Sequence, residues 1–130
     1  MTIRALNHFT VMSRDLDASR EFYCEVLGME VGARPPMSFP GLWLYAEGAP
    51  ILHLVGVQEA TASRNGVIDH VALTASNLRE VVGRLQAKNI KHSLRRTPDR
   101  GWQLFCRDPD GAMIELAFAA EEIAPEDIAS

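Results

Sequence analysis

Ile51-Leu52-His53-Leu54 returns 62 residues later, without a gap, as Met113-Ile114-Glu115-Leu116. The same shift carries His8 onto His70, so the two candidate residues of each half are 45 positions apart. The chain has four histidines, and three of them thus stand with one carboxylate at equivalent points of an apparent repeat. Imidazole and carboxylate groups both bind divalent transition metals. The arithmetic therefore predicts a metal site built by duplication.

The repeat extends over the whole of each half. Apolar alternation predicts strands, and apolar residues at helical spacing predict one helix after the first strand of each half. The shift of 62 also places Leu16 on Leu78, although the match weakens between the helix ends, where Gly28 falls on Ile90. The order βαβββ, met twice, indicates an α+β fold of two tandem modules. The expected strands are 6–12, 29–34, 42–45 and 51–57 in the first module and 68–74, 90–96, 102–107 and 113–118 in the second.

Turn and cap residues predict where these elements begin and end. Gly28 is expected to end the first helix, and Ser76 or Asn77 to cap the second. The stretch Asp108-Pro109-Asp110-Gly111 has the composition of a hairpin turn, so its carboxylates are not expected to form a site.

Composition indicates an ordinary globular chain. Of the 130 residues, 47% are hydrophobic and 23% are charged, and the net charge is −4. The sequence shows no basic stripe, so we do not expect nucleic acid as a partner. No apolar run is long enough to cross a membrane. Cys24 and Cys106 are too few for a disulfide framework, so we expect a cytoplasmic protein with reduced thiols. We expect a single domain over 1–130, with module 1 at about 4–57, a linker at 58–66, module 2 at about 67–118 and a loosely held acidic tail at 119–130.

Strand alternation indicates which way the four candidate residues point. Side chains on a strand alternate between its two faces, and each candidate lies on the face away from the bulkiest apolar neighbours. If the helices lie outside and cover the bulky faces, the other faces curve as one mixed sheet around a cavity that holds His8, His53, His70 and Glu115. A carboxylate there is expensive to leave unpaired, and ligation of a divalent cation by these residues removes that cost.

Simple hairpin registers predict the rest of the cavity. They place four apolar side chains on its wall and Trp102 at its mouth, while Trp43 and Tyr45 pack under a helix. Arg34 and Arg96 stand at repeat-equivalent positions, where they either hold an anionic group of the substrate or are ordinary exposed strand-end arginines. His92 has no counterpart in the first half and is expected at the surface. The predicted wall residues are Leu42, Leu44, Leu104 and Cys106.

These residues resemble the vicinal oxygen chelate superfamily, which includes glyoxalase I, extradiol dioxygenases, methylmalonyl-CoA epimerase and the fosfomycin and bleomycin resistance proteins. The resemblance covers roughly residues 4–118. It rests on Asn7-His8, Phe22-Tyr23 with Val26-Leu27-Gly28, Asp69-His70-Val71 and the run from Arg107 to Leu116. It implies metal ligation by His8, His70 and Glu115, one divalent ion (Ni, Zn, Fe(II) or Mn), a small-molecule substrate and, for members of this size, a homodimer whose sites take ligands from both chains.

Three functions remain open at this point. In a glyoxalase-like lyase or isomerase, His53 completes a set of four ligands where relatives usually have glutamate, or glutamine in epimerases. Glu115, if it leaves the metal, then moves a proton as a general base. In an extradiol-type dioxygenase, His8, His70 and Glu115 form the two-histidine, one-carboxylate triad typical of Fe(II), and His53 is an acid–base group beside it. In a non-catalytic antibiotic-binding protein of the bleomycin resistance type, the metal ligands are generally missing, so their presence here favours the first two.

Overall fold

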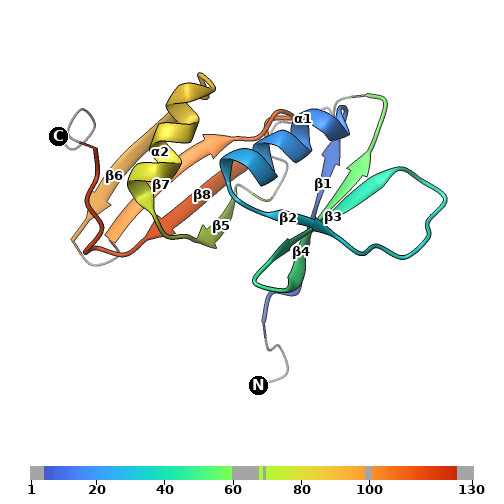
Figure 1. Ribbon diagram of the computed structural model, residues 1–130, viewed down its shortest axis with the longest axis horizontal. Helices are drawn as coiled ribbons and strands as arrows, with labels where there is room; N and C mark the ends of the chain where they lie inside the picture. The colour runs from blue at the N-terminus through green and yellow to red at the C-terminus, as the bar shows by residue number, and fades with distance from the viewer. Residues whose placement is uncertain (1–4, 60–67, 69, 99–100, 126–130) are drawn as a thin grey trace. The chain divides into compact units, whose positions relative to one another are not determined.

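The computed structural model describes residues 5–59, 68, 70–98 and 101–125 (Figure 1). The chain divides into two compact units, residues 1–62 and 63–130. Each is described below by itself, as module 1 and module 2. No helix of the described residues is long and apolar enough to cross a membrane.

Module 1 is a four-stranded mixed sheet with one helical segment. The sheet has the order β1-β4-β3-β2, in which β1 and β4 are parallel and the other neighbours antiparallel. The helical segment begins as α-helix and continues directly as a π-helix. The elements are β1 (Phe9–Ser13), α1 (Leu16–Arg20), η1 (Glu21–Val26), β2 (Glu30–Gly32), β3 (Gly41–Ala46) and β4 (Ala49–Gly56).

Module 2 repeats this arrangement with the strand order β5-β8-β7-β6. Here too the first and last strands are parallel and the others antiparallel. The α+β class and the tandem βαβββ modules are therefore confirmed, with the strands of each module paired in a sheet of their own. The elements are β5 (Val71–Thr74), α2 (Leu78–Ala87), β6 (His92–Thr97), β7 (Gly101–Arg107) and β8 (Met113–Phe118).

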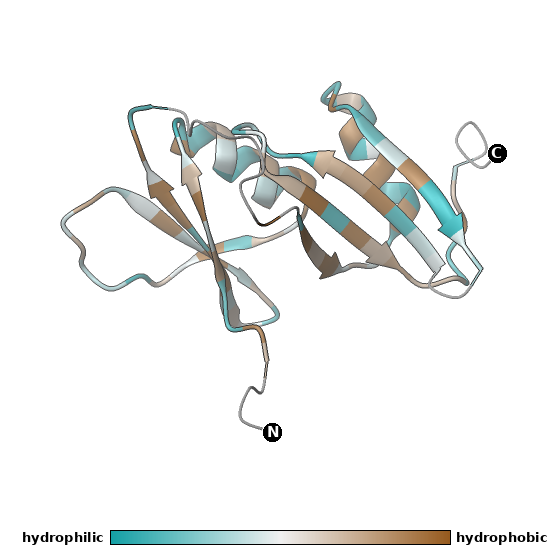
Figure 2. Ribbon diagram, turned by 180° about the vertical axis from the view of Figure 1, so that it is seen from behind, coloured by the Kyte–Doolittle hydropathy of each residue, from teal (hydrophilic) through white to brown (hydrophobic). Residues whose placement is uncertain are grey.

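The core of each module lies on the sheet face that the sequence alternation predicts. Val11, Leu52 and Leu54 are buried in module 1, whereas His8 and Thr10 are exposed. In module 2 the helix residues Leu78, Val81, Val82 and Leu85 and the strand residues Leu104, Ile114, Leu116 and Phe118 are all buried. Figure 2 shows the corresponding change between brown and teal or white along the strands.

The weak match between the two helix ends has a structural cause. Each helix is followed by a residue with positive φ, Gly28 (84°) in module 1 and Asn89 (56°) in module 2, so the repeat distance has fallen from 62 to 61. Module 1 has one residue more in this helix, and a π-helical turn accommodates such an extra residue. The offset of 61 persists into the next strand, β2 in module 1 and β6 in module 2. There Gly32, opposite Trp43, corresponds to Ser93, opposite Phe105. The offset returns to 62 at β3 and β7.

The two helices are capped in different ways. The Asp15 side chain accepts a hydrogen bond from the Ala18 amide at 3.1 Å, as a local N-cap does. Asn77 takes the predicted cap position of α2 but makes no side-chain cap bond. Instead the Glu122 carboxylate accepts from the amides of Leu78 (2.6 Å) and Asn77 (3.1 Å).

The expectation of a loose tail from residue 119 onward is therefore wrong as far as residue 125. Glu122 is tied down a second time, because its carbonyl accepts a hydrogen bond from Trp102 Nε1 at 2.8 Å, and Ala124 is buried. The turn at Asp108–Gly111 forms as predicted. The Asp108 side chain accepts from the amides of Asp110 and Ala112, and Gly111 has a positive φ of 95°.

Candidate functional site

Strand register decides which side chains share a face with the candidate ligands. Residues directly opposite each other in an antiparallel pair point to the same side of the sheet. In module 1 Trp43 is opposite His53, while Leu44 is opposite Leu52 and Leu42 opposite Leu54. Leu42 and Leu44 therefore lie on the core face, and the prediction that they line the cavity is wrong. Trp43 lies on the His53 face, so its predicted place under a helix is also wrong.

The same correction applies to module 2. Leu104 pairs with Leu116 and Cys106 with Ile114, so both predicted wall residues belong to the core. Burial raises the pKa of the Cys106 thiol to about 12, with a smaller contribution from Asp108, which keeps the thiol protonated and unreactive. Trp102 is opposite Phe118 and is therefore also on the core face, not at the mouth of a cavity.

Both errors come from a shift of one residue. A simple turn at Glu47-Gly48 would pair Leu42 with His53, but a β-bulge between Leu44 and Ala46 moves the register of β3 by one position. In module 2 Arg107 pairs with Met113, so the connection is one residue longer than the turn motif suggests. A slip of one residue turns every side chain of a strand to the other face.

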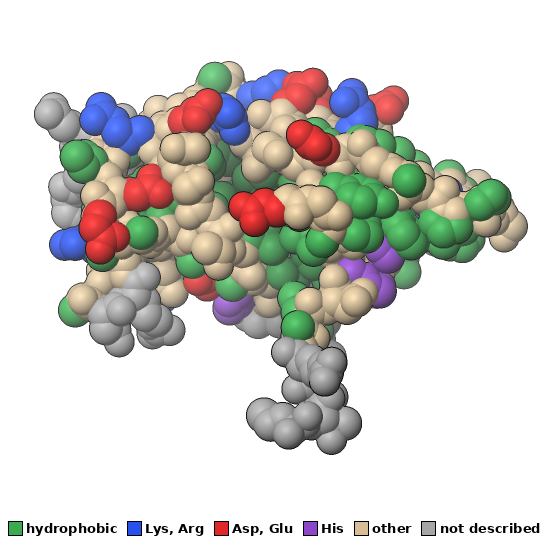
Figure 3. All heavy atoms as spheres, turned by 60° about the horizontal axis from the view of Figure 1, so that its bottom comes forward, with side chains coloured by type: hydrophobic (Ala, Val, Ile, Leu, Met, Phe, Trp, Pro, Cys, Tyr) green, Lys and Arg blue, Asp and Glu red, His purple; other side chains and the backbone are tan. Residues whose placement is uncertain are grey.

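In module 1 three aromatic rings lie face to face. The His53 ring stacks on Trp43 with ring centroids 4.0 Å apart and an angle of 7° between the planes. On its other side His53 stacks on His8, again at 4.0 Å, with an angle of 16°. His8 Nδ1 lies 2.7 Å from the Asn7 side-chain oxygen. Figure 3 shows histidine side chains (purple) reaching the surface beside hydrophobic ones (green).

The surroundings of His53 favour the neutral imidazole. Burial lowers its pKa, the nearby His8 lowers it further, and a hydrogen bond with the Pro50 backbone opposes both. A neutral imidazole keeps a lone pair on one ring nitrogen, which is the form that binds a metal or accepts a proton.

In module 2 the candidate pair is a contact between an imidazole nitrogen and a carboxylate oxygen. His70 Nε2 lies 3.2 Å from Glu115 Oε1, and Gln103 Nε2 donates to Glu115 Oε2 at 3.3 Å. Glu115 is 9% exposed, and the Phe105 ring meets the His70 ring edge-on at 6.0 Å between centroids. Sequence reasoning missed Gln103 and Phe105, which the correct β7 register would have placed on the Glu115 face.

Each of the two predicted arginines donates a hydrogen bond to a backbone carbonyl. Arg34 Nη2 donates to the Phe39 carbonyl at 2.9 Å, with its guanidinium over the Phe39 ring. Arg96 is opposite Trp102, on the core face, and donates to the Ala120 carbonyl at 3.2 Å. Its neighbour Arg95 is opposite Gln103 and thus on the Glu115 face. At the offset of 61 Arg95 is also the residue that corresponds to Arg34.

The donors fit a divalent transition ion in kind. Imidazole nitrogen and carboxylate oxygen bind such ions at about 2.0–2.2 Å, and two donors on one ion are therefore about 3 Å apart, as His70 and Glu115 are. His8 and His53 have the right chemistry, but a ring binds a metal in its own plane, so one of these stacked rings must turn before both bind one ion. Among the described residues no three His, Cys, Asp or Glu side chains are gathered as a metal-binding group.

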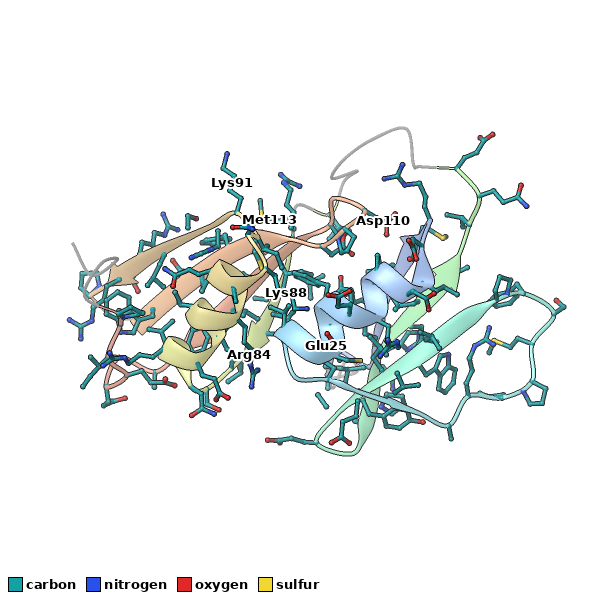
Figure 4. All side chains as sticks on the ribbon, turned by 45° about the horizontal axis from the view of Figure 1, so that its top comes forward. Glu25, Arg84, Lys88, Lys91, Asp110 and Met113 are labelled. Atoms are coloured by element: carbon teal, nitrogen blue, oxygen red, sulfur yellow. The ribbon has the colours of Figure 1, made fainter. Side chains whose placement is uncertain are left out.

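A cavity of about 470 Å³ lies in module 2 beside this site. Lys91, Phe105, Arg107 and Met113 are among its lining residues, as are His92 and the buried Cys106, and Phe105 is the ring that meets His70. Figure 4 shows Lys91 and Met113 at the same end of the β6–β8 sheet. The cavity therefore combines apolar walls with two cationic side chains.

Comparison with known proteins agrees with this architecture. The chain is 30% identical over 122 residues to glyoxylase I 4 of Arabidopsis thaliana, covering 88% of this chain and 70% of the relative. It superposes on a glyoxylase/bleomycin resistance protein/dioxygenase domain from Frankia sp. EAN1pec with a TM-score of 0.77, at 20% identity and over 91% and 99% of the two chains. The antibiotic-binding protein TnmS3 of Streptomyces sp. CB03234 gives a TM-score of 0.65 at 23% identity, over 91% and 98% of the two chains.

The family profile matches nearly the whole of both modules. It covers residues 5–116, from just before His8 to just after Glu115. The chain therefore belongs to the glyoxalase/bleomycin resistance protein/dioxygenase superfamily, as the resemblance of its motifs predicts.

Proposed function

We propose that this protein is a metal-dependent enzyme of the glyoxalase type, a lyase or isomerase whose small organic substrate is bound through two neighbouring oxygens. One observation carries the proposal: in each module the two candidate residues contact each other, His8 with His53 in module 1 and His70 with Glu115 in module 2. These four residues would hold one divalent ion. Such an ion supplies a Lewis acid that stabilises negative charge on substrate oxygens.

The residues of the chain itself divide the remaining work. We propose that Glu115, after leaving the ion, takes a proton from a carbon of the substrate and returns it to the next carbon. It is suited to this because it is buried and because only one of its oxygens is held by Gln103. The cavity beside Phe105, with Lys91 and Arg107 on its wall, is the proposed place for the rest of the substrate.

A second candidate, an extradiol-type dioxygenase, is favoured by the surroundings of His53. Held between Trp43 and His8 with a lowered pKa, His53 has the form of an acid–base group beside a three-residue ligand set. His8, His70 and Glu115 would then be the Fe(II) triad.

Metal content tests the proposal first. We expect protein purified without chelator to hold about one divalent ion per site, and His8→Ala, His70→Ala and Glu115→Ala to lose it. His92→Ala is the matched control for metal content, because His92 lines the cavity but its Nδ1 is bound to the Ile90 carbonyl and it is not one of the four proposed ligands. Full metal content in the Glu115→Ala protein contradicts the proposal, and a wild-type protein without metal that binds an antibiotic points to a binding protein instead.

Activity then separates the two reactions. The glyoxalase-type proposal expects isomerisation of hemithioacetals and loss of metal in His53→Ala. Oxygen uptake with a panel of catechols, together with a His53→Ala protein that keeps its metal but is inactive, supports the dioxygenase.

We further propose a homodimer with the ligands of each site shared between chains. Mixing His8→Ala with Glu115→Ala protein tests this, because a mixed dimer then contains one site with all four ligands. Recovered metal binding and activity on mixing supports shared sites, and no recovery indicates that each site forms within one chain.

A further inference from the structure

A line of polar contacts joins three strands of the module 2 sheet to the residue that precedes the fourth. It starts at His70, just before β5, and passes to Glu115 on β8, Gln103 on β7 and Arg95 on β6. The three contacts measure 3.2 Å, 3.3 Å and 3.0 Å. Gln103 is only 6% exposed, so its amide lies inside the module. The strand register decides the place of Gln103. It is opposite Arg95 on β6 and opposite Ala117 on β8, the neighbouring strand that also contains Glu115.

The two ends of the Gln103 amide are chemically different, and its neighbours determine which end faces which. Arg95 Nε can only donate a hydrogen bond, so it must face Gln103 Oε1. Gln103 Nε2 then points to Glu115 Oε2, which accepts a hydrogen bond as a carboxylate oxygen. The reverse orientation would set two donors against each other at one end and two acceptors at the other. Arg95 thereby selects one orientation of the amide.

This orientation has a consequence for Glu115. One carboxylate oxygen is held by the Gln103 amide, and the other is directed to His70 Nε2. A side chain that holds a metal ligand from behind determines the angle at which the ligand approaches the ion. Arg95 is itself held, since its guanidinium lies over the Phe105 ring at 5.6 Å from the ring centroid.

The described residues of module 1 contain no counterpart of this arrangement. The residue equivalent to Gln103 at the offset of 62 is Gly41, where an added Cβ would lie 2.4 Å from the Leu54 carbonyl oxygen and 3.0 Å from Arg34 Nη2. No side chain fits there, and the candidate in that module is an imidazole, not a carboxylate. The amide is therefore present only in the module that contains a carboxylate to be held.

We propose that Gln103 is the positioning residue of Glu115, and that Arg95 sets the orientation of its amide. The inference rests on the proposed function, in which Glu115 binds a divalent ion. It assigns to Gln103 no contact with the substrate or the ion. Its role is to direct one oxygen of Glu115 to the site by holding the other.

Zn²⁺ affinity and the visible absorption of Co²⁺ test this role without any substrate. We expect Gln103→Met, which keeps the length of the side chain but removes the amide, to weaken Zn²⁺ binding by about 10- to 100-fold in competition with a chelator. We also expect it to change the Co²⁺ absorption bands, because the carboxylate then binds in another geometry. Arg95→Met should shift both readouts in the same direction by less. Arg96→Met is the matched control and should leave them unchanged, since Arg96 is on the opposite face.

Several outcomes decide against the inference. If Gln103→Met binds Zn²⁺ as tightly as wild type and has the same Co²⁺ spectrum, Gln103 has no positioning role, while the proposed function stands. If Gln103→Met does not fold, the exposed Arg95 carries the test, and an Arg95→Met protein with wild-type affinity and spectrum overturns the inference. If the wild-type protein binds neither ion, the proposed function fails and this inference fails with it.

Discussion

Module 1 and module 2 have the same strand order and the same strand directions, yet they hold their candidate residues by different physical means. In module 1 the two imidazoles are stacked with Trp43 and make few polar contacts. In module 2 a carboxylate is surrounded by His70, Gln103 and, behind the amide, Arg95. The duplicated backbone thus provides equivalent positions, and the residues on the third strand of each module decide how those positions are supported.

The difference follows from what each candidate needs. A neutral imidazole can be buried against aromatic rings at little cost, whereas a buried carboxylate requires hydrogen-bond donors. Trp43 in module 1 corresponds to Phe105 in module 2 at the offset of 62, and both rings contact a candidate histidine. Gln103 is the additional group that accompanies the carboxylate.

The largest effect should come from the two cores. Leu52 and Ile114 are repeat-equivalent and fully buried, so we expect Leu52→Ala and Ile114→Ala each to lower the free energy of unfolding by about 2–5 kcal/mol. Each module contains one of the two tryptophans. In a Trp102→Phe background the fluorescence of Trp43 reports denaturant unfolding of module 1, and in a Trp43→Phe background that of Trp102 reports unfolding of module 2.

Because each strand of the described residues pairs within its own module, each core substitution should shift mainly the transition that its own tryptophan reports. Ile123→Ala, at a residue that is 70% exposed, is the control and should change stability by less than about 0.5 kcal/mol. Equal shifts at both tryptophans would show instead that the modules unfold together.

The helix caps should give an intermediate effect. We expect Asp15→Ala and Glu122→Ala each to lower the free energy of unfolding by about 0.5–2 kcal/mol, measured by thermal or denaturant melting. Glu122→Ala should cost more, because the Glu122 carboxylate accepts from two backbone amides and Asp15 from one. Ser76→Ala should cost almost nothing. A larger loss in Ser76→Ala than in Glu122→Ala would contradict the cap that the structure assigns to α2.

The smallest effect should appear in the titration of His53. We expect Trp43→Leu to raise the pKa of His53 toward its ordinary value, because burial is the main cause that lowers it. NMR titration of the imidazole protons in chelator-treated protein measures this, with Trp102→Leu as the control in the other module. An unchanged His53 pKa in Trp43→Leu would mean that Trp43 does not provide the burial.

The sign of the corresponding pH effect on stability follows directly. A lowered pKa means that the folded metal-free protein binds fewer protons at His53 than the unfolded chain does. The stability that His53 contributes is present above its ordinary pKa and is lost as the pH falls through the lowered one. Trp43→Leu should reduce this loss.

Much of the site follows from alternation and repetition along the chain. The spacing of 62 residues identified the repeat. Alternation placed His8, Thr10 and His53 on the sheet face away from the core, where the structure has them. Whether the four residues bind a metal stays a prediction. The wall residues were wrong because a single bulge at Leu44–Ala46 and one extra residue after Arg107 each turn a strand over. Gln103 was missed because of the extra residue after Arg107, and Arg95 was missed because the repeat offset between β2 and β6 is 61 and not 62.

The sequence by itself determined the two modules, the order of their elements along the chain and the faces of β1, β4, β5 and β8, because apolar periodicity is a local property that burial makes costly to violate. Only the tertiary structure decided the faces of β3 and β7, the cap that Glu122 provides for α2, and the contacts of Gln103. These depend on hydrogen-bond register and on residues distant in the chain, and a change of one residue in a loop is enough to alter them. The repeat locates the candidate ligands, and the register decides what supports them.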